Sequence, residues 1–596
     1  MIDQLISQKT IEIVEELYGV KPDPTILQIE KTNRDFEGDL TLIVFPLLRI
    51  SKKPPHITAE EIGGKLVEKV DTIDRFNVVK GFLNLSLASD YWLSFLKQNV
   101  KKEDFGFAHP DGNKPVIIEY SSPNTNKPIH LGHIRNNLLG FSLAEILKAN
   151  GKNVIKVNLI NDRGIHICKS MLAWQKYGHG ETPESSGTKG DHLVGKYYVL
   201  FDKKNKEEAS RLIKAGFSEE DAASQTSLMK EAKDMLLKWE AHDPEVLEIW
   251  KQMNGWTYAG FEVTYKRLGV DFDQINYESE TYLAGKAMVE DGLSENIFAR
   301  HDDGSVWVDL RDEGLDEKLL LRSDGTSLYI TQDLGTAQKR YDEFNPQQMI
   351  YVVGNEQIYH FDVLKKIFKK LGRPWFEMIY HLSYGMVELP HGRMKSREGT
   401  VVDADDLMDE MYLTAKKTTE ELGKTDDFTE EERDQLYNIL SLGALKYYIL
   451  KVDPKKNMLF NPDESIDFNG NTGPFIQYTY ARIQSIFRKA AQKPQGILDA
   501  VNYQSIELLP VEKEIIQKIS VFPEVVKQAG EQYSPAQIAN YVFDLVKTYN
   551  HFYQDTPILK RVDEATSQFR MALSFFTGTV IKKCMNLLGI DVPDKM

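Results

Sequence analysis

The sequence predicts an α/β protein built around a doubly wound parallel sheet, with an N-terminal α/β module before it and an all-α helical bundle after it. Three observations predict this fold class. β-branched runs begin at Val116 and Val154, and the residues between them have the apolar spacing of a helix. The stretch from Lys203 to Gly269 is strongly charged and helical in pattern. After Asp403 the spacing is helical almost throughout, as in an α-bundle.

The strand–helix–strand unit from Val116 to Ile160 has the clearest pattern. The run Val116–Ile118 suits a strand that is buried on both faces, and Val154–Ile160 is a second run of this kind. The helical spacing between them stops at Gly151. Such a unit implies a Rossmann-like parallel sheet, whose functional site lies at the carboxyl ends of the strands.

A chain of 596 residues is too long for one hydrophobic core, so we expect several domains. Composition and pattern predict an N-terminal α/β module (residues 1–110), the doubly wound domain (111–402) with a helical insertion at about 178–269, a linking helical segment (403–467) and the helical bundle (468–596).

Local patterns place the elements inside these segments. The N-terminal module should contain a helix at Ile2–Leu17 and strands at Leu40–Leu48 and Phe82–Leu87. The stretch Tyr177–Gly195 has no periodicity and is typical of a surface insertion or a linker. Further strands are expected at Val306–Val308, Leu328–Ile330 and Met349–Val353. Helices of the bundle are expected at Phe475–Ala491, Val511–Gln528, Pro535–Asp555 and Thr566–Leu588.

Bulk composition excludes several classes of protein. Cys168 and Cys584 are the two cysteines, which excludes a disulfide scaffold and a cysteine zinc site. No apolar run approaches the roughly 18 residues of a membrane helix, and the acidic N-terminal helix is unlike a signal peptide, so we expect a cytoplasmic protein without a membrane partner. The net charge of −16 argues against nucleic acid, but the chain from Asn469 onward has fourteen basic residues against twelve acids, which leaves room for a basic face.

Two segments carry chemistry that suits a nucleotide. His130-Leu131-Gly132-His133 opens the first predicted helix of the doubly wound domain, where imidazole donors and the helix dipole favour a polyphosphate and the glycine leaves room for a base. Two partly buried structural histidines are the alternative. The loop His391–Val402 places Arg393, Lys395 and Arg397 among glycines, which suits either a phosphate clamp or a solvated turn.

Together these motifs resemble those of class I aminoacyl-tRNA synthetases, and specifically of the arginyl-tRNA synthetase family. The resemblance covers nearly the whole chain. Its motifs are Ser121–Asn124 with Lys127-Pro128 and His130–His133 (the extended HIGH signature), Tyr329–Leu334 (the arginine pocket), Val352–Gln357 (the nucleotide side) and Gly470–Pro474 (the start of the anticodon-binding domain). The loop Arg393–Arg397 resembles the KMSKS motif but lacks its second lysine.

The resemblance implies ligation of L-arginine to tRNA(Arg) in two steps through arginyl-adenylate, with ATP and its Mg²⁺, by a monomer. No dedicated metal site is expected. Residues 1–110 would contact the tRNA elbow and 468–596 the anticodon, with Tyr478 and Arg482 on tRNA. The residues implied in catalysis are Lys127, His130, Gly132, His133 and Lys395, and ATP would also contact Gly354, Arg393 and Met394.

A guanidinium offers five donors in a fixed fork and therefore needs a carboxylate that accepts two parallel bonds. Within the resemblance Asp333 is the expected acid, Tyr329 covers the guanidinium face, and Gln357 presents its amide. Ser122, Asn124 and His133 would hold the α-amino and carboxylate groups. On the residues alone, Asp333 is equally well explained as the N-cap of a following helix.

Two other functions are compatible with parts of this pattern. A nucleotidyltransferase for a smaller substrate uses the same H-x-G-H fold, although it needs no helical C-terminal domain. A tRNA-binding relative without catalysis would explain the degenerate lysine loop. An ATP-dependent exchange assay with each amino acid separates the three.

Overall fold

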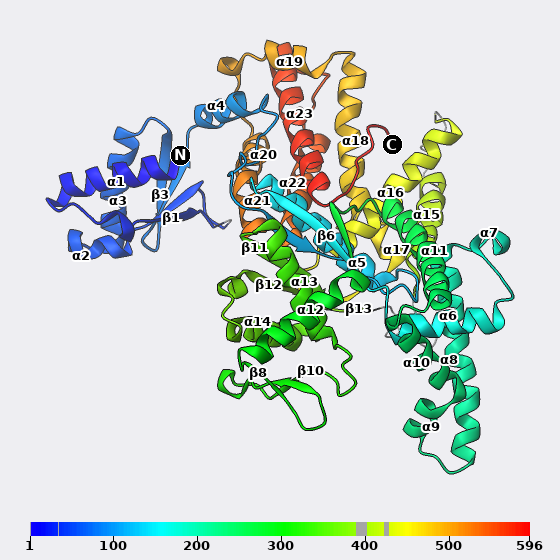
Figure 1. Cartoon of the computed structure of the whole chain (residues 1–596). Helices are drawn as coiled ribbons and strands as arrows, with labels where there is room; N and C mark the ends of the chain where they lie inside the picture. Colours follow the sequence, from blue (N-terminus) through cyan, green and yellow to red (C-terminus); the bar gives the residue numbers. More distant parts are fainter. Residues whose placement is uncertain (1, 34, 389–401, 422, 424–427) are drawn as a thin grey trace. The chain divides into compact units, whose positions relative to one another are not determined.

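The computed structural model describes residues 2–33, 35–388, 402–421, 423 and 428–596 (Figure 1). The chain divides into two compact units. Unit 1 comprises residues 1–105, 486–521 and 547–578, and unit 2 comprises residues 106–485, 522–546 and 579–596.

Unit 1 contains a four-stranded antiparallel sheet in the order β1-β2-β4-β3. The helices and strands of its first segment, residues 1–105, are α1 (Ile2–Tyr18), β1 (Gln28–Lys31), β2 (Leu40–Ile43), α2 (Leu48–Ser51), α3 (Pro55–Lys69), β3 (Ile73–Val79), β4 (Phe82–Leu87) and α4 (Ser89–Asn99). Helix α3 packs closely on the sheet, since a Cβ added at Gly63 would lie 2.6 Å from the Phe76 ring. The strand expected at Leu40–Leu48 ends at Ile43, because Phe45–Leu47 form a 3-10 turn around Pro46.

The central sheet of unit 2 has five strands, all parallel, in the order β12-β11-β5-β6-β7. They are β5 (Val116–Glu119), β6 (Val154–Ile160), β7 (Gln274–Tyr277), β11 (Gln348–Gly354) and β12 (Ile379–Tyr384). The first strand is therefore central, and the chain adds strands first on one side of it and then on the other. This order confirms the doubly wound fold and places its switch point between β5 and β11.

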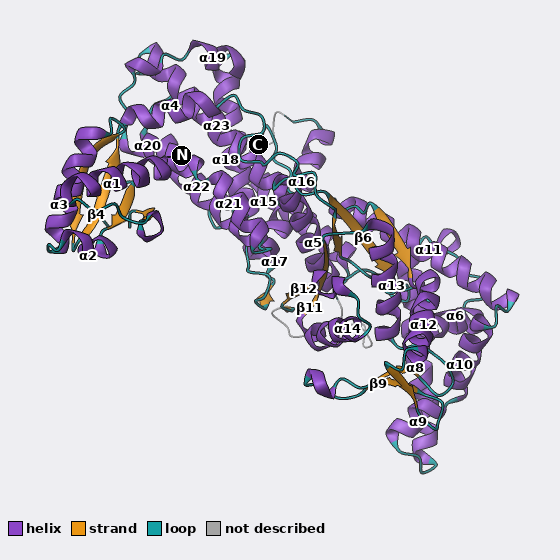
Figure 2. Ribbon diagram, turned by 60° about the vertical axis from the view of Figure 1, so that its left-hand side comes forward, coloured by secondary structure: helices purple, strands orange, loops and turns teal. Residues whose placement is uncertain are grey.

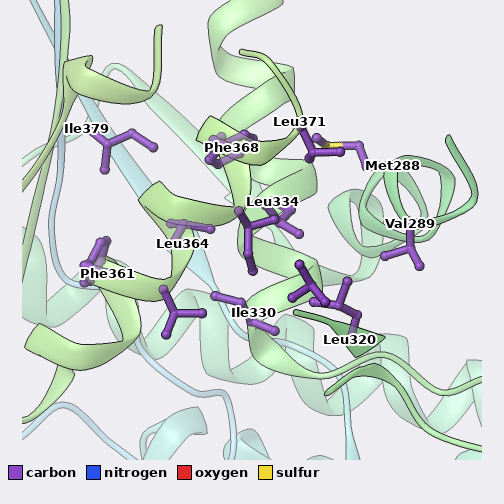
Figure 3. Packing of buried hydrophobic residues seen from close by; sticks show 14 of the residues in the cluster. Met288, Val289, Leu320, Ile330, Leu334, Phe361, Leu364, Phe368, Leu371 and Ile379 are labelled. Carbon is purple, nitrogen blue, oxygen red and sulfur yellow. The ribbon is translucent and has the colours of Figure 1, made fainter. Parts of the chain in front are cut away.

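Helices α5 (Leu131–Ala149), α12 (Glu278–Ser294), α13 (Tyr329–Phe344) and α14 (Ile358–Lys370) connect the sheet strands, and a small sheet of β8 (Phe298–Arg300), β9 (Val306–Val308) and β10 (Lys318–Leu321) lies between α12 and α13 in sequence. Figure 3 shows the buried side chains that hold α12, α13 and α14 together, among them Leu334, Leu364 and Phe368. Their burial, at about 1.5–3 kcal/mol for each large apolar side chain, holds these helices against one another.

The strand predicted at Leu328–Ile330 is wrong. Leu328 is the extended cap of α13, and the helix begins at Tyr329. The apolar positions Ile330, Leu334 and Ala337 are buried at helical spacing, so the helical period determines this segment. Asp333 consequently lies inside the helix, and the alternative that it is an N-cap is also wrong.

The insertion is a helical subdomain with its own core. It contains α6 (Ile165–Tyr177), α7 (Pro183–Ser186), α8 (Gly190–Lys214), α9 (Glu219–Gln225), α10 (Ser227–Glu240) and α11 (Pro244–Leu268). Leu193, Leu228 and Trp239 belong to its buried cluster. The stretch Tyr177–Gly195, predicted without regular structure, instead contains α7 and the first turns of α8. Leu193 and Val194 are buried residues of α8, and the polar composition around them gave no helical pattern.

The remaining described elements are mostly helical (Figure 2). They are β13 (Val387–Glu388), α15 (Ala404–Glu421), α16 (Glu430–Leu450), β14 (Met458–Leu459), α17 (Pro462–Ser465), α18 (Gly473–Ala490), α19 (Pro494–Ala500), α20 (Pro510–Ser520), α21 (Phe522–Glu531), α22 (Pro535–Asp555) and α23 (Glu564–Leu587). The single helix expected at Val511–Gln528 is two, α20 and α21, and Pro523 lies in the first turn of α21, a position that proline tolerates.

Arg135 fixes α5 to two loops of unit 2. Its side chain is fully buried, and its guanidinium donates to backbone carbonyls alone among the described residues. The shortest of these bonds run to the oxygens of Gly385 and Lys456, at 2.7 and 2.8 Å. One acceptor segment directly precedes β13 and the other precedes β14, so Arg135 joins the helix to both.

Candidate active site

The H-x-G-H segment forms the start of α5, at the carboxyl end of β5. His130 is the extended N-cap residue, and its backbone N–H donates to Nδ1 of His133 at 3.2 Å. The two imidazole rings are 3.9 Å apart between centroids. A Cβ added at Gly132 would lie 3.1 Å from the His130 ring, so the glycine allows this ring to pack against the helix. The helix N-terminus and both rings thus form one donor surface.

Burial controls the charges of this surface. Desolvation, helped by nearby Lys127, lowers the pKa of His130 to about 3, and it lowers the pKa of His133 well below its usual range. Both histidines are therefore neutral donors at physiological pH. Burial also lowers the pKa of Lys127. Within the described ranges no carboxylate forms an ion pair with Lys127, so its ammonium is available to an anionic ligand.

The loop between β5 and α5 is held in a strained path. Ser121 and Ser122 have φ values of 76° and 45°, which side-chain-bearing residues rarely adopt. The amide oxygen of Asn136 accepts from the Ser121 N–H at 2.5 Å, and that of Asn158 accepts from the Ser122 N–H at 3.0 Å. Strain of this kind, over-determined by neighbours, is common at functional sites. Asn124 follows in the same loop and forms a bridge with Asn161.

The residues from Val402 to Ala404, at and after the end of the predicted loop His391–Val402, lie against the H-x-G-H segment. The N–H of Leu131 donates to the carbonyl of Val402 at 3.1 Å, and the N–H of Ala404 donates to that of Ile129 at 2.9 Å. The segment beginning at Val402 thus pairs with the H-x-G-H segment. The predicted ATP-binding residues Arg393, Met394 and Lys395 lie outside the described residues.

A cavity of about 830 Å³ lies between α10, the β10 turn and the starts of α13 and α14. Tyr329 lines it and is 63% exposed. Asp333, one turn further along α13, accepts from Nε2 of His360 at 2.6 Å, and His360 also lines the cavity. Tyr329 and Asp333 share a helix face because they are four residues apart. They therefore lie on one side of this element, as they would have in the predicted strand.

Sequence reasoning missed two charged residues at this cavity, Glu278 and Arg163. Glu278 is buried, and desolvation raises its pKa to about 8 although nearby Arg163 lowers it. The Arg163 guanidinium bonds Glu240 at 2.8 Å and lies 4.0 Å from the Tyr282 ring centroid. Glu278 directly follows β7, so the rule that ligands bind at carboxyl ends of parallel strands was a signal for it.

The other predicted contacts are not among the residues that line this cavity. Gly354 is the buried last residue of β11, and a Cβ there would lie 2.3 Å from the Glu356 carboxylate. Gln357 is exposed in the short turn before α14. Tyr478 and Arg482 share a face of α18, where the guanidinium lies 4.8 Å from the ring centroid.

One described group of side chains has the composition of a metal site. Ligand atoms of Asp191, His192 and Asp405 lie within 4.8 Å of one another. The ammonium group of Lys189 bonds both carboxylates and thereby occupies the place of a cation. Elsewhere in the molecule, no helix of the described ranges combines the length and apolar character needed to cross a membrane.

Comparison with known proteins identifies the class. Residues 96–461 match the family of class I (R) tRNA synthetase catalytic domains, residues 476–596 match the DALR anticodon-binding domain, and residues 1–87 match the arginyl-tRNA synthetase N-terminal domain. The parallel sheet and its H-x-G-H helix start are thus those of a class I aminoacyl-tRNA synthetase.

Curated relatives specify the branch. The chain is 58% identical to the arginine–tRNA ligase of Bacteroides fragilis over 100% of this chain and 99% of that one, and 56% identical to that of Flavobacterium psychrophilum over 96% and 97%. The fold is also that of the Thermus thermophilus arginyl-tRNA synthetase, with a TM-score of 0.75 at 22% identity over 100% of both chains. The chain belongs to the arginyl-tRNA synthetase family, whose members attach arginine to tRNA.

Proposed function

We propose that this enzyme makes arginyl-tRNA(Arg) in two steps. A carboxylate oxygen of L-arginine attacks the α-phosphorus of ATP, the bond to the β-phosphate breaks, and pyrophosphate leaves arginyl-adenylate. The 2′-hydroxyl of the terminal adenosine of tRNA then attacks the arginyl carbonyl, and AMP leaves. The observation that supports this most is that the H-x-G-H donor surface follows β5 while Glu278, which lines the large cavity, follows β7, so both come after carboxyl ends of strands in one parallel sheet. Such chemistry needs mainly positioning and charge neutralisation from the protein.

The phosphate end is assigned to the segment that starts α5. His130 and His133 donate to the triphosphate as neutral imidazoles, and Gly132 lets the adenine pack against the helix. Lys127 neutralises charge on the departing pyrophosphate, because its ammonium forms no ion pair with a carboxylate among the described residues. Arg393, Met394 and Lys395 are assigned to ATP on the sequence alone, as is Gly354.

The arginine end is assigned to the large cavity. Asp333 accepts from the guanidinium, Tyr329 covers its face, and Glu278 is added as a second carboxylate because it lines the same cavity. His360 holds the Asp333 carboxylate in place. Ser122, Asn124, His133 and Gln357 remain assigned to the polar groups of the substrate by resemblance.

Mg²⁺ is expected to arrive with ATP and to neutralise its phosphates, without a dedicated protein site. Residues 1–110 are assigned to the tRNA elbow and 468–596 to the anticodon, with Tyr478 and Arg482 as tRNA contacts. We further propose that the enzyme acts as a monomer in the cytoplasm. Light scattering of the purified full-length chain tests the oligomeric state.

Charging assays with the full chain, ATP, Mg²⁺ and tRNA(Arg) test the function. We expect tRNA to accept arginine and none of the other amino acids at a comparable rate. ATP–pyrophosphate exchange without any transfer to tRNA would favour a smaller-substrate nucleotidyltransferase. Binding of tRNA without exchange would favour a relative that has lost catalysis. The assay includes tRNA at every stage, since the family resemblance implies that activation requires it.

A further inference from the structure

The H-x-G-H segment supplies hydrogen-bond donors but no positive charge. Burial keeps His130 and His133 neutral. Pyrophosphate carries several negative charges when it leaves, so the described part of the phosphate site has one cation, Lys127, for a strongly anionic product. Beside Arg393 and Lys395, which lie outside the described residues, any further charge has to come from another element that faces the same space.

A second cavity shows which element this is. It has a volume of about 410 Å³, and one wall is formed by Lys127, Pro128 and His130. The opposite wall is helix α8 of the insertion, through His192, Gly195, Lys196 and Val199. These positions are spaced as i, i+3, i+4 and i+7, so one face of α8 is turned to the phosphate side.

Gly195 allows this approach. A Cβ added there would lie 2.9 Å from Cδ of Pro128 and 3.7 Å from Cα of Lys127. The backbone of α8 therefore passes unusually close to the segment that precedes the histidines. Any larger side chain would force the helix away from Lys127.

Acidic residues also line this cavity, and the helix neutralises one of them. Nε2 of His192 lies 3.1 Å from the Asp403 carboxylate and 3.4 Å from that of Asp405. These carboxylates raise the pKa of His192 to about 10, so it is an imidazolium at neutral pH. Asp406 lines the same cavity. Without His192, the charge on Asp403 would repel a phosphate group.

Lys196 provides a further cation on the same face of α8. Its ammonium bonds Glu181 at 2.7 Å, and the two side chains are 54% and 26% exposed. Exposed pairs of this kind are weak because water screens them. The flexible lysine side chain can therefore exchange Glu181 for a phosphate oxygen in the cavity, where the competing anion carries more charge.

We propose that Lys196 and His192 complete, together with Lys127, the binding site for the leaving pyrophosphate. Lys196 contacts its terminal phosphate oxygens, and His192 is a positioning residue that keeps Asp403 neutralised. The insertion thus takes part in the first reaction step, beyond its structural role. This inference rests on the proposed function.

Titration calorimetry with inorganic pyrophosphate and the full-length protein tests the contact. Lys196→Gln should weaken pyrophosphate binding about tenfold, the effect of one lost charge-assisted contact. AMP lacks the β- and γ-phosphates that Lys196 would contact, so the affinity of the variant for AMP should stay unchanged. Lys204→Gln serves as the matched control, since Lys204 lies on α8 outside the cavity and pairs with Glu207. Parental pyrophosphate affinity in Lys196→Gln, or an equal loss for AMP, would overturn the proposal.

A rescue experiment tests the role of His192. His192→Gln should weaken pyrophosphate binding, and adding Asp403→Asn should restore it, because the repelling charge is then absent. If the double variant binds pyrophosphate no better than His192→Gln, the neutralising role is wrong. Failure of the proposed function is seen separately, as absence of arginine charging by the parental enzyme.

Discussion

Glu119 and Arg340 form an ion pair that is almost fully buried at the end of the central strand. Arg340 reaches from α13 and donates to one oxygen of the Glu119 carboxylate, while Ser122 donates to the other at 3.0 Å. The relative exposures of the two residues are 7% and 2%. The pair thus connects the helix that carries Asp333 with the loop that carries Ser122, so the two ends of the proposed arginine site share one support.

Removing one member of this pair should strongly destabilise unit 2. Arg340→Met leaves the Glu119 carboxylate buried without its partner, and the expected loss in the free energy of unfolding is about 3–5 kcal/mol. Denaturant titration measures it. Arg300→Met is the matched control, because the Arg300–Glu290 pair is 50% and 62% exposed and should be worth about 1 kcal/mol or less. Equal losses in the two variants would contradict the argument.

Asp333→Asn tests the specificity acid. The substitution keeps the shape and an acceptor for His360 but removes the charge, so the fold should persist. Use of arginine should weaken by about 2–4 kcal/mol, the range for removing one partner from a desolvated charge pair. The measurement is kcat/KM for arginine in tRNA charging, with the KM for ATP as an internal reference.

His360→Gln separates the contact of Asp333 with the substrate guanidinium from its hydrogen bond with His360. The glutamine keeps a donor near the Asp333 carboxylate, so arginine use should fall much less than in Asp333→Asn. If Asp333→Asn charges tRNA at the parental rate, Asp333 has no substrate contact and the specificity acid is another residue, with Glu278 the first to examine.

His133→Ala tests the donor surface. The variant removes a neutral imidazole from the triphosphate site, and adenylate formation should fall by at least about 10²-fold, the usual scale for a lost electrostatic contact. ATP–pyrophosphate exchange in the presence of tRNA measures this. Exchange at the parental rate would show that His133 is a structural histidine.

Glu278 predicts a pH dependence for arginine binding. Its pKa is raised from 4.5 to about 8, so the carboxyl of the free protein is mostly protonated at pH 7. Binding a guanidinium favours the carboxylate, so a proton is released, and affinity should increase with pH until about pH 8. Calorimetry in two buffers of different ionisation enthalpy measures the release.

The same proton affects stability with the opposite sign. The folded state holds it more tightly than the unfolded chain, so this stabilising contribution is present below pH 4.5 and is lost as the pH rises through about 8. Glu278→Gln should abolish both effects. Undiminished proton release on arginine binding in that variant would assign the proton to another group.

Much of the fold could be predicted because its strongest patterns are local. The limits of β6 are those of the run Val154–Ile160, and α22 has the predicted limits Pro535–Asp555. The error at Leu328–Ile330 has the opposite cause. A short apolar run is compatible with both the strand period and the helix period. The residues that decide for a helix, Leu334 and Ala337, come later in the chain.

The site could be predicted only in part, because a cavity depends on distant segments. The H-x-G-H motif is contiguous, so its place at a helix start followed from the sequence. Glu278 and His360 come near Asp333 through the order of sheet strands, which composition does not reveal. The α8 face depends on Gly195, and a glycine in a charged helix gives no signal of what lies opposite.

The cage around Arg135 distributes evolutionary constraint unevenly. Its acceptors are backbone carbonyls, which every amino acid possesses, so most side chains in these two loops can change without loss of a bond. Gly385 is the exception, because a Cβ there would lie 2.5 Å from the carbonyl oxygen of Lys456. An insertion or deletion in either loop would instead shift the carbonyls themselves. Over evolution, most residues of these loops should therefore be able to change while the loop lengths stay constant, and Arg135 and Gly385 should stay fixed.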